Sequence, residues 1–215
     1  MSLMRVRSVL VVLAVVVSGV GVSGGAAVQA QSVQVGGGGG WAVPTNNVRA
    51  EAKMVDESLA IDLKPGPHAY ADAGLVWSLG DRFALGGRIR VQASRLRSTV
   101  DCDDGSCGAP DGLLRAATLE GRFLFTSIDW IQPYVLVGLG VVNITVDAVR
   151  DQETGRTYEE VVVTDAGGDV GLGAAIPVVS DLFLDAEVRV TGTLPGGKEN
   201  AVTTLPFALG LSYRF

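Results

Sequence analysis

The sequence is poor in the residues from which most catalytic and metal sites are built. Its 215 residues include one histidine and two cysteines, which leaves little material for a zinc site or a histidine-based catalytic centre. Charged residues make up only 19% of the chain, and the 17 basic residues are outnumbered by 23 acidic ones. A formal net charge of −6 argues against a nucleic-acid-binding protein, because such proteins present a basic face.

Long hydrophobic runs are also missing. After the N-terminus no uncharged apolar segment reaches the length of about 18–20 residues that a transmembrane helix needs. Hydrophobic residues nevertheless make up 47% of the chain, which is too much for a disordered protein. We therefore expect one folded domain that does not depend on membrane-spanning helices.

The N-terminal thirty residues have the pattern of a secretory signal peptide. A short basic start is followed by an apolar stretch, Val9–Val17, and then by small residues that end at Ala30. This order predicts cleavage before Gln31. The chain then divides into a signal peptide, residues 1–30, and an exported domain, residues 31–215. An uncleaved N-terminal anchor is the alternative.

Export decides how the two cysteines are interpreted. Cys102 and Cys107 lie five positions apart in a polar segment, and in an oxidising compartment this spacing favours a small-loop disulfide. Asp101, Asp103 and Asp104 are hard oxygen ligands, so a calcium site is the alternative. The glutamate that a calcium loop needs at a later position is missing, and we expect no metal site.

Alternation of apolar and polar residues with a period of two recurs through the exported domain. It is clearest over residues 205–215, where the odd positions are apolar and the even ones small or polar. Eight strands are expected, at residues 33–42, 69–77, 83–92, 117–125, 135–142, 169–176, 182–190 and 205–215. The first is the least regular, because Gly36–Gly40 interrupts the alternation.

The connections between these strands alternate in length. Short turns are expected at 79–82, 127–132 and 177–181, and long polar connections at 43–66, 98–113, 147–160 and 192–200. An up-and-down barrel with an even number of strands has this order when both termini lie on the side of the short turns. The sequence therefore predicts an all-β fold, an eight-stranded antiparallel up-and-down transmembrane β-barrel.

The charged residues indicate which face of the sheet points inward. Eleven charges fall opposite the apolar face of their strands: Asp72, Arg88, Arg90, Glu120, Arg122, Asp165, Asp169, Asp185, Glu187, Arg189 and Arg214. The three lysines, Lys53, Lys64 and Lys198, all lie in expected loops, whereas the strand cations are arginines, which suit enclosed ion pairs. We expect the polar face to line the lumen and the apolar face to contact lipid.

These inward charges are the main candidate site. Five arginines nearly balance six carboxylates, and eight strands leave an interior only just wide enough for side chains. We expect arginines such as Arg88, Arg90 and Arg122 to bridge to acidic residues on neighbouring strands and to plug the lumen. An ion-conducting or substrate-guiding channel is the alternative.

The C-terminus carries a family resemblance. The chain ends with Gly210, Tyr213 and Phe215 at positions that resemble the signal by which the bacterial barrel assembly machinery recognises outer-membrane proteins. Residues 133–140 also look like the fifth strand of small eight-stranded porin-family barrels of the OmpA/OmpX type. The resemblance implies an outer-membrane protein with both termini in the periplasm, assembled by that machinery. No peptidoglycan-binding domain is expected after Phe215.

Two other features carry no chemistry in this interpretation. His68, the only histidine, has no serine near it in its strand, so we expect a surface or rim residue with no catalytic role. Gly36–Gly40 is followed by neither the Lys-Ser/Thr pair nor the helix of a phosphate loop.

The sequence thus predicts a non-enzymatic outer-membrane protein without cofactors, with a structural or interaction role through its loops. Outer-membrane lipids are the expected surroundings, a monomer is the expected state, and the partner of the acidic loops is unidentified. Two alternatives stay open: a narrow channel for small solutes, and a soluble periplasmic carrier resembling a lipocalin, which needs an apolar interior.

Overall fold

The computed structural model describes residues 32–46, 48–51, 58–100, 110–150, 157–194 and 202–215. The regular elements within these ranges are all strands: β1 (Ser32–Pro44), β2 (Val48–Glu51), β3 (Ser58–Lys64), β4 (Gly66–Ser78), β5 (Phe83–Val100), β6 (Gly112–Phe125), β7 (Gln132–Val146), β8 (Val149–Arg150), β9 (Thr157–Tyr158), β10 (Val161–Val179), β11 (Leu182–Thr193) and β12 (Thr203–Arg214). No helix in these ranges is long and apolar enough to cross a membrane. The expected signal peptide at 1–30 and the expected Cys102–Cys107 disulfide lie outside the described residues.

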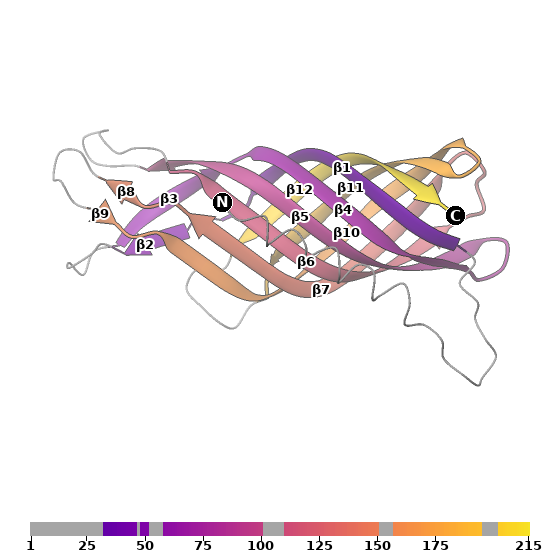
Figure 1. Ribbon diagram of the computed structural model, residues 1–215, viewed down its shortest axis with the longest axis horizontal. Coiled ribbons are helices and arrows are strands. Elements are labelled where there is room, and N and C mark those ends of the chain that lie inside the picture. Colours follow the sequence, from indigo (N-terminus) through magenta and orange to yellow (C-terminus); the bar gives the residue numbers. More distant parts are fainter. Residues whose placement is uncertain (1–31, 47, 52–57, 101–109, 151–156, 195–201) are drawn as a thin grey trace, which may run out of the picture.

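Eight of the strands form a closed ring, and Figure 1 shows the barrel from the side, with its strands inclined to its long axis. Each of β1, β4, β5, β6, β7, β10, β11 and β12 pairs antiparallel with the next, and β12 pairs with β1 to close the ring. Neighbours in the ring are thus also successive long segments of the chain, which is the up-and-down order. The prediction of an eight-stranded antiparallel barrel is confirmed.

The ring closes with a large stagger between its strands. The paired inward-facing residues can be followed from one strand to the next around the ring. Starting at Phe183 on β11, they pass through Gly36 on β1 and Arg90 on β5. They return to β11 at Thr193, ten residues further along. With about 3.4 Å per residue and about 4.8 Å between strands, this stagger tilts the strands by about 40°. Residues that meet across the lumen can therefore lie far apart in register.

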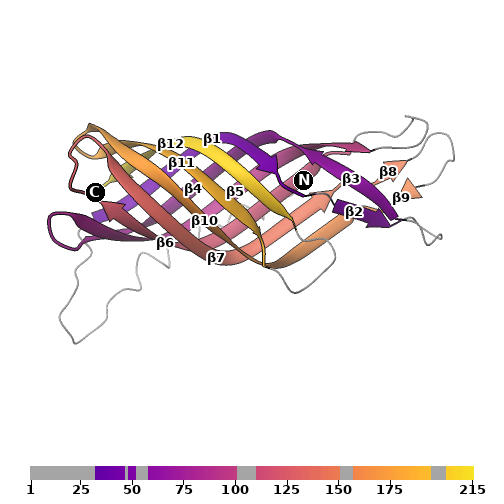
Figure 2. The same cartoon turned by 180° about the vertical axis from the view of Figure 1, so that it is seen from behind.

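The two ends of the barrel differ, as Figures 1 and 2 show from opposite sides. One end has the short turns and the C-terminus, and there the Phe215 amide donates to the Val33 carbonyl at 2.9 Å. The tight turn between β4 and β5 uses Gly80, whose positive φ of 87° suits glycine. The long connections lie at the other end.

Two of the long connections contain strands that the sequence pattern did not predict. The connection 43–66 includes β2 and β3, and β3 pairs with the end of β5, from Lys64 opposite Arg97 to Ile61 opposite Val100. The connection 147–160 includes the short pair β8–β9. β5 therefore extends to Val100 because β3 gives its outer end a partner. We call this end of the barrel the outer end.

The alternating pattern determines which side chains face outward. Leu119 on β6 and Leu139 on β7 are 67% and 64% exposed, whereas the neighbouring inward residues Glu120 and Arg90 are almost completely buried. The polar face therefore lines the lumen, as expected from the sequence. This orientation does not support the soluble carrier, which needs an apolar cavity inside the ring.

Candidate functional site

Arg88 is the hub of a charge network in the middle of the lumen. Register places Arg88 on β5 directly opposite Glu120 on β6, and its Nε donates to Glu120 Oε2 at 2.6 Å. Its other nitrogens reach Asp72 Oδ2 on β4 at 3.0 Å and Glu187 Oε2 on β11 at 3.2 Å. Arg88 thus joins carboxylates from three different strands, and its planar fork of donors suits this task.

Two more arginines complete the network. Arg90 Nη2 lies 2.5 Å from Glu187 Oε1, and its guanidinium stacks 3.5 Å from the centre of the Tyr70 ring. Arg189 donates to Glu120 Oε1 at 2.7 Å and to Glu187 Oε1 at 2.8 Å. Its Nη1 also lies 3.5 Å from Asp169 Oδ2.

We call these seven residues the central network: Asp72, Arg88, Arg90, Glu120, Asp169, Glu187 and Arg189. Each is less than 10% exposed. Three arginines against four carboxylates leave it close to neutral, and its ion pairs link β4, β5, β6, β10 and β11 across the lumen. Ion pairs between these buried side chains thus cross the lumen at this level.

Four predicted lumen charges lie outside this network. Arg122 was expected to bridge to an acid. Among the described residues it instead donates from Nη2 to Gln34 Oε1 at 2.7 Å and has no carboxylate within ion-pair distance. The register of β6 with its two neighbours explains this, since the residue opposite Arg122 on β7 is Leu136 and that on β5 is Gly86.

The other three make separate contacts. Asp185 accepts a hydrogen bond from the Ser212 hydroxyl at 2.5 Å. Arg214 donates to Gln132 Oε1 at 2.9 Å and stacks 3.9 Å from the Phe183 ring centre. Asp165 lies towards the outer end of β10, only half-buried, where its carboxylate accepts from the Ala166 amide. These three residues do not extend the central network.

His68 is a second correction to the sequence-based interpretation. It is not at the surface but only 4% exposed, and its Nδ1 lies 2.9 Å from Ser94 Oγ. The serine comes from β5, directly opposite His68 in register, so a search along the strand of His68 could not find it. His68 Nε2 has no partner among the described residues. Both side chains point into the lumen and are buried, Ser94 completely.

Buried apolar clusters lie on both sides of the central network. Towards the outer end, buried apolar side chains form one packed cluster, which we call the outer cluster: Ala42, Ile61, Leu63, Leu96, Leu114, Ala116, Val142, Ile144, Val146, Tyr158, Val163 and Val202. Towards the end with the short turns, a smaller inner cluster contains Val76, Ala84, Leu124, Tyr134, Leu136, Ala175 and Phe183. The central network therefore has the outer cluster on one side, and on the other side the inner cluster, whose Tyr134 and Phe183 rings contact Arg122 and Arg214.

The sequence contains a signal for the outer cluster that the prediction of one constant alternation missed. Along β5 the charges sit at the inward positions Arg88 and Arg90, but at the outward positions Arg95 and Arg97 further on. Leu96, between them, is fully buried. Near the outer end the polarity of the two faces of the sheet is therefore reversed. The inward side chains are polar in the middle of the barrel and apolar towards its outer end. A barrel that is partly in lipid and partly in water needs this reversal.

The proposed C-terminal signal residues lie on both faces. Tyr213 and Phe215 point outward, and their rings contact edge to face with centres 4.8 Å apart. Gly210 points inward, where an added Cβ would lie 2.2 Å from the Tyr70 hydroxyl, so glycine gives Tyr70 its space. The described residues include no group of three or more His, Cys, Asp or Glu that could hold a metal ion.

Comparisons with known proteins agree with this geometry. Neisserial surface protein A is similar in structure, with a TM-score of 0.50 and 15% identity over 85% of this chain and 97% of that one. OprG from Pseudomonas aeruginosa gives a TM-score of 0.51 and 13% identity, covering 87% and 97% of the two chains. The outer membrane protease OmpT from Escherichia coli gives 0.53 and 10%, covering 89% and 99%. Identities this low show the fold alone.

No curated protein matches the sequence. The sequence does match the family described as outer membrane protein beta-barrel domain, over residues 12–215. Homologous barrels are bacterial outer-membrane proteins, and most members of the family are not enzymes. The match spans nearly the whole chain and agrees with the closed eight-stranded ring, and the chain therefore belongs to the outer-membrane β-barrel family.

Proposed function

We propose that this protein is a non-enzymatic, monomeric outer-membrane barrel whose role is structural or depends on interactions of its outer end. One observation supports the proposal: buried inward side chains occupy the lumen at successive levels. Arg88, Arg90 and Arg189 are bound to carboxylates in the middle, and packed apolar side chains lie on either side of them. Such a barrel offers its surface, and not its interior, to other molecules.

The orientation in the membrane is part of this proposal. Short turns lie at the end where Phe215 contacts Val33, and long connections lie at the other. In outer-membrane barrels the short turns are periplasmic and the longer loops extracellular. Both ends of the barrel strands, at Ser32 and Phe215, would then face the periplasm, where the assembly machinery meets the C-terminal residues.

A narrow channel is the alternative, and conductance tests it. The purified barrel, reconstituted in a planar bilayer, should show little or no steady current, because opening a path requires breaking buried ion pairs, which costs about 3–5 kcal/mol when one partner is lost. Stable, ion-selective openings of the unmodified protein would replace the plugged barrel with the channel as the preferred function.

Cell fractionation tests the membrane assignment itself. The exported protein should sediment with the outer membrane and need detergent for release, because side chains such as Leu119 and Leu139 are exposed around the ring. Recovery in the soluble periplasmic fraction without detergent would contradict the proposal. A soluble exported barrel of the same size serves as the control for incomplete fractionation.

A further inference from the structure

Four cations lie together on the outward face of the barrel, close to its outer end. They are Lys64 on β3, Arg95 and Arg97 on β5, and Arg115 on β6, and we call them the basic tier. Register makes them neighbours: Arg115 pairs with Ala93, two residues before Arg95, and Lys64 pairs with Arg97. Directly opposite and diagonal positions on one face of a sheet are within reach of long side chains. All four side chains are exposed.

The basic tier begins where the apolar face ends. Towards the outer end of β5, the outward residues are Val91, then Ala93 and then Arg95. In the same direction along β6, which runs antiparallel, Ala117 is followed by Arg115. Apolar surface and cations are therefore continuous on the same side of the wall. A lipid molecule lying against these strands would meet the cations with its polar head and not with its chains.

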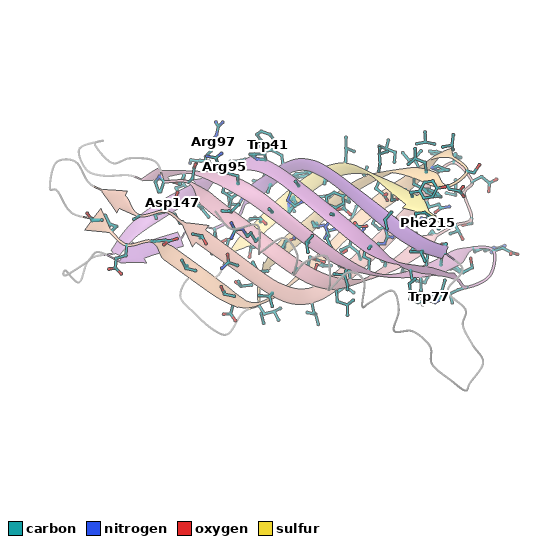
Figure 3. All side chains as sticks on the ribbon, viewed as in Figure 1. Trp41, Trp77, Arg95, Arg97, Asp147 and Phe215 are labelled. Carbon is teal, nitrogen blue, oxygen red and sulfur yellow. The ribbon has the colours of Figure 1, made fainter. Side chains whose placement is uncertain are left out.

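Tryptophans locate the two edges of the apolar face. Figure 3 shows Trp41 near Arg95 and Arg97, at the end opposite Trp77 and Phe215. Trp41 is 54% exposed and Phe215 71%, and outward aromatic residues form belts at both membrane interfaces of such barrels. The cations beside Trp41 consequently lie at the level of lipid headgroups in one leaflet.

Only two of the four cations of the basic tier form ion pairs with carboxylates among the described residues. Lys64 pairs with Asp62, and Arg95 with Asp111. Arg97 and Arg115 have no carboxylate within ion-pair distance among the described residues. Lys64 and Arg97 are also directly opposite each other, a like-charge arrangement that is unfavourable in a sheet without a counter-ion.

We propose that the basic tier binds the phosphate groups of outer-leaflet lipid, the phosphorylated glucosamine headgroup of lipopolysaccharide. Arginine forms paired, charge-assisted hydrogen bonds with phosphate oxygens. A phosphate at Arg97 relieves its repulsion with Lys64, which lies directly opposite, and a second phosphate can bind at Arg115, diagonal to Arg95. The inference rests on the proposed function, because it needs the apolar face in lipid and the outer end outside the cell.

Lipid binding by the purified barrel tests this directly. Native mass spectrometry or a fluorescent-lipid titration in detergent compares bis-phosphorylated lipid A with the same lipid after removal of both phosphates. The unmodified protein should prefer the phosphorylated form. In the triple variant R95Q/R97Q/R115Q that preference should fall by about tenfold or more, since each basic residue near an anionic membrane surface contributes measurably. Binding of the dephosphorylated lipid should not change.

Arg82 provides the matched control. It is an exposed arginine in the turn between β4 and β5, at the opposite end of the barrel, so R82Q removes one charge without touching the basic tier. It should leave the phosphate preference unchanged. Equal preference in the triple variant and the unmodified protein would overturn the inference. So would an equal loss in R82Q, since that would indicate non-specific attraction.

Failure of this inference can be told apart from failure of the proposed function. A barrel that inserts into phosphatidylcholine vesicles but does not distinguish phosphorylated from dephosphorylated lipid A contradicts the basic tier alone. A chain that does not insert contradicts both. The substituted side chains are exposed, and the single variants R97Q and R115Q, each with its own measured unfolding midpoint, exclude misfolding as the cause of a loss.

Discussion

Replacing Arg88 by alanine should destabilise the barrel more than any other single loss of an arginine from the lumen. The side chain forms ion pairs with Asp72, Glu120 and Glu187 at 3.0, 2.6 and 3.2 Å, in a buried layer. Removing it leaves three carboxylates facing one another, with only Arg90 and Arg189 to compensate. Breaking a buried ion pair from one side costs about 3–5 kcal/mol, and we expect about 4 kcal/mol for Arg88→Ala.

Arg122→Ala is the internal comparison. Arg122 is as deeply buried, but its contacts are one hydrogen bond to Gln34 and a stacking distance of 5.2 Å to the Tyr134 ring. Losing them should cost about 1–3 kcal/mol. The exposed turn residue Arg82 should change stability by no more than about 0.5 kcal/mol when replaced by alanine. Reversible urea unfolding in lipid vesicles, followed by tryptophan fluorescence, measures all three.

The order of the three variants decides the outcome. Arg88→Ala should be the least stable. The double variant Arg88→Met/Glu120→Gln should recover part of the lost free energy of unfolding, because it removes Arg88 together with one of its carboxylate partners and leaves fewer buried charges unpaired. If Arg88→Ala unfolds at the same urea concentration as Arg122→Ala, the ion pairs of the central network do not stabilise the barrel. The ion pairs would then give no energetic reason for the lumen to stay closed.

Three further changes examine other layers of the barrel. Leu209→Arg places a charge on the outward face and should cost about 2–4 kcal/mol if that position lies near the membrane midplane, whereas the inward Ala208→Ser should be nearly silent; reversed sensitivities in the same unfolding assay would mean that the faces are inverted. Deleting Phe215 should reduce the amount of folded barrel in outer-membrane fractions, and normal accumulation would refute its role as an assembly signal. Leu114→Ala removes a fully buried side chain of the outer cluster and should cost about 2–5 kcal/mol; an unchanged midpoint would indicate that this cluster is loosely packed.

Alternation along each strand was enough to predict the barrel and the inward charges, because the side-chain period of a strand fixes its face. It could not give the height of a residue along the barrel axis. That height depends on the ten-residue stagger of the ring, which cannot be inferred from the residue pattern of any single strand. Arg88 meets Glu187, 99 positions later in the chain, whereas Arg122 meets an uncharged glutamine.

The same limit explains the errors at the outer end. His68 acquires Ser94 as a partner only when β4 and β5 pair. Arg95 and Arg97 lie beyond the point where the expected strand ended, so the alternation did not assign them to the outward face. A strand that leaves the lipid must reverse its pattern, and a search for one constant alternation stops where the reversal begins.

Gly36–Gly40 has a consequence for how the ring closes. These glycines lie in β1, which pairs with β12 from the opposite end of the chain. An added Cβ at Gly38 or Gly40 would lie 2.2 or 1.8 Å from a carbonyl oxygen of β12, so glycine permits this close approach. Five consecutive glycines carry no side chains that distinguish one register from the next. The register at which the two ends of the chain close the ring is therefore specified by the side chains that flank the glycines, such as Gln34 opposite Arg214 and Trp41 opposite Phe207.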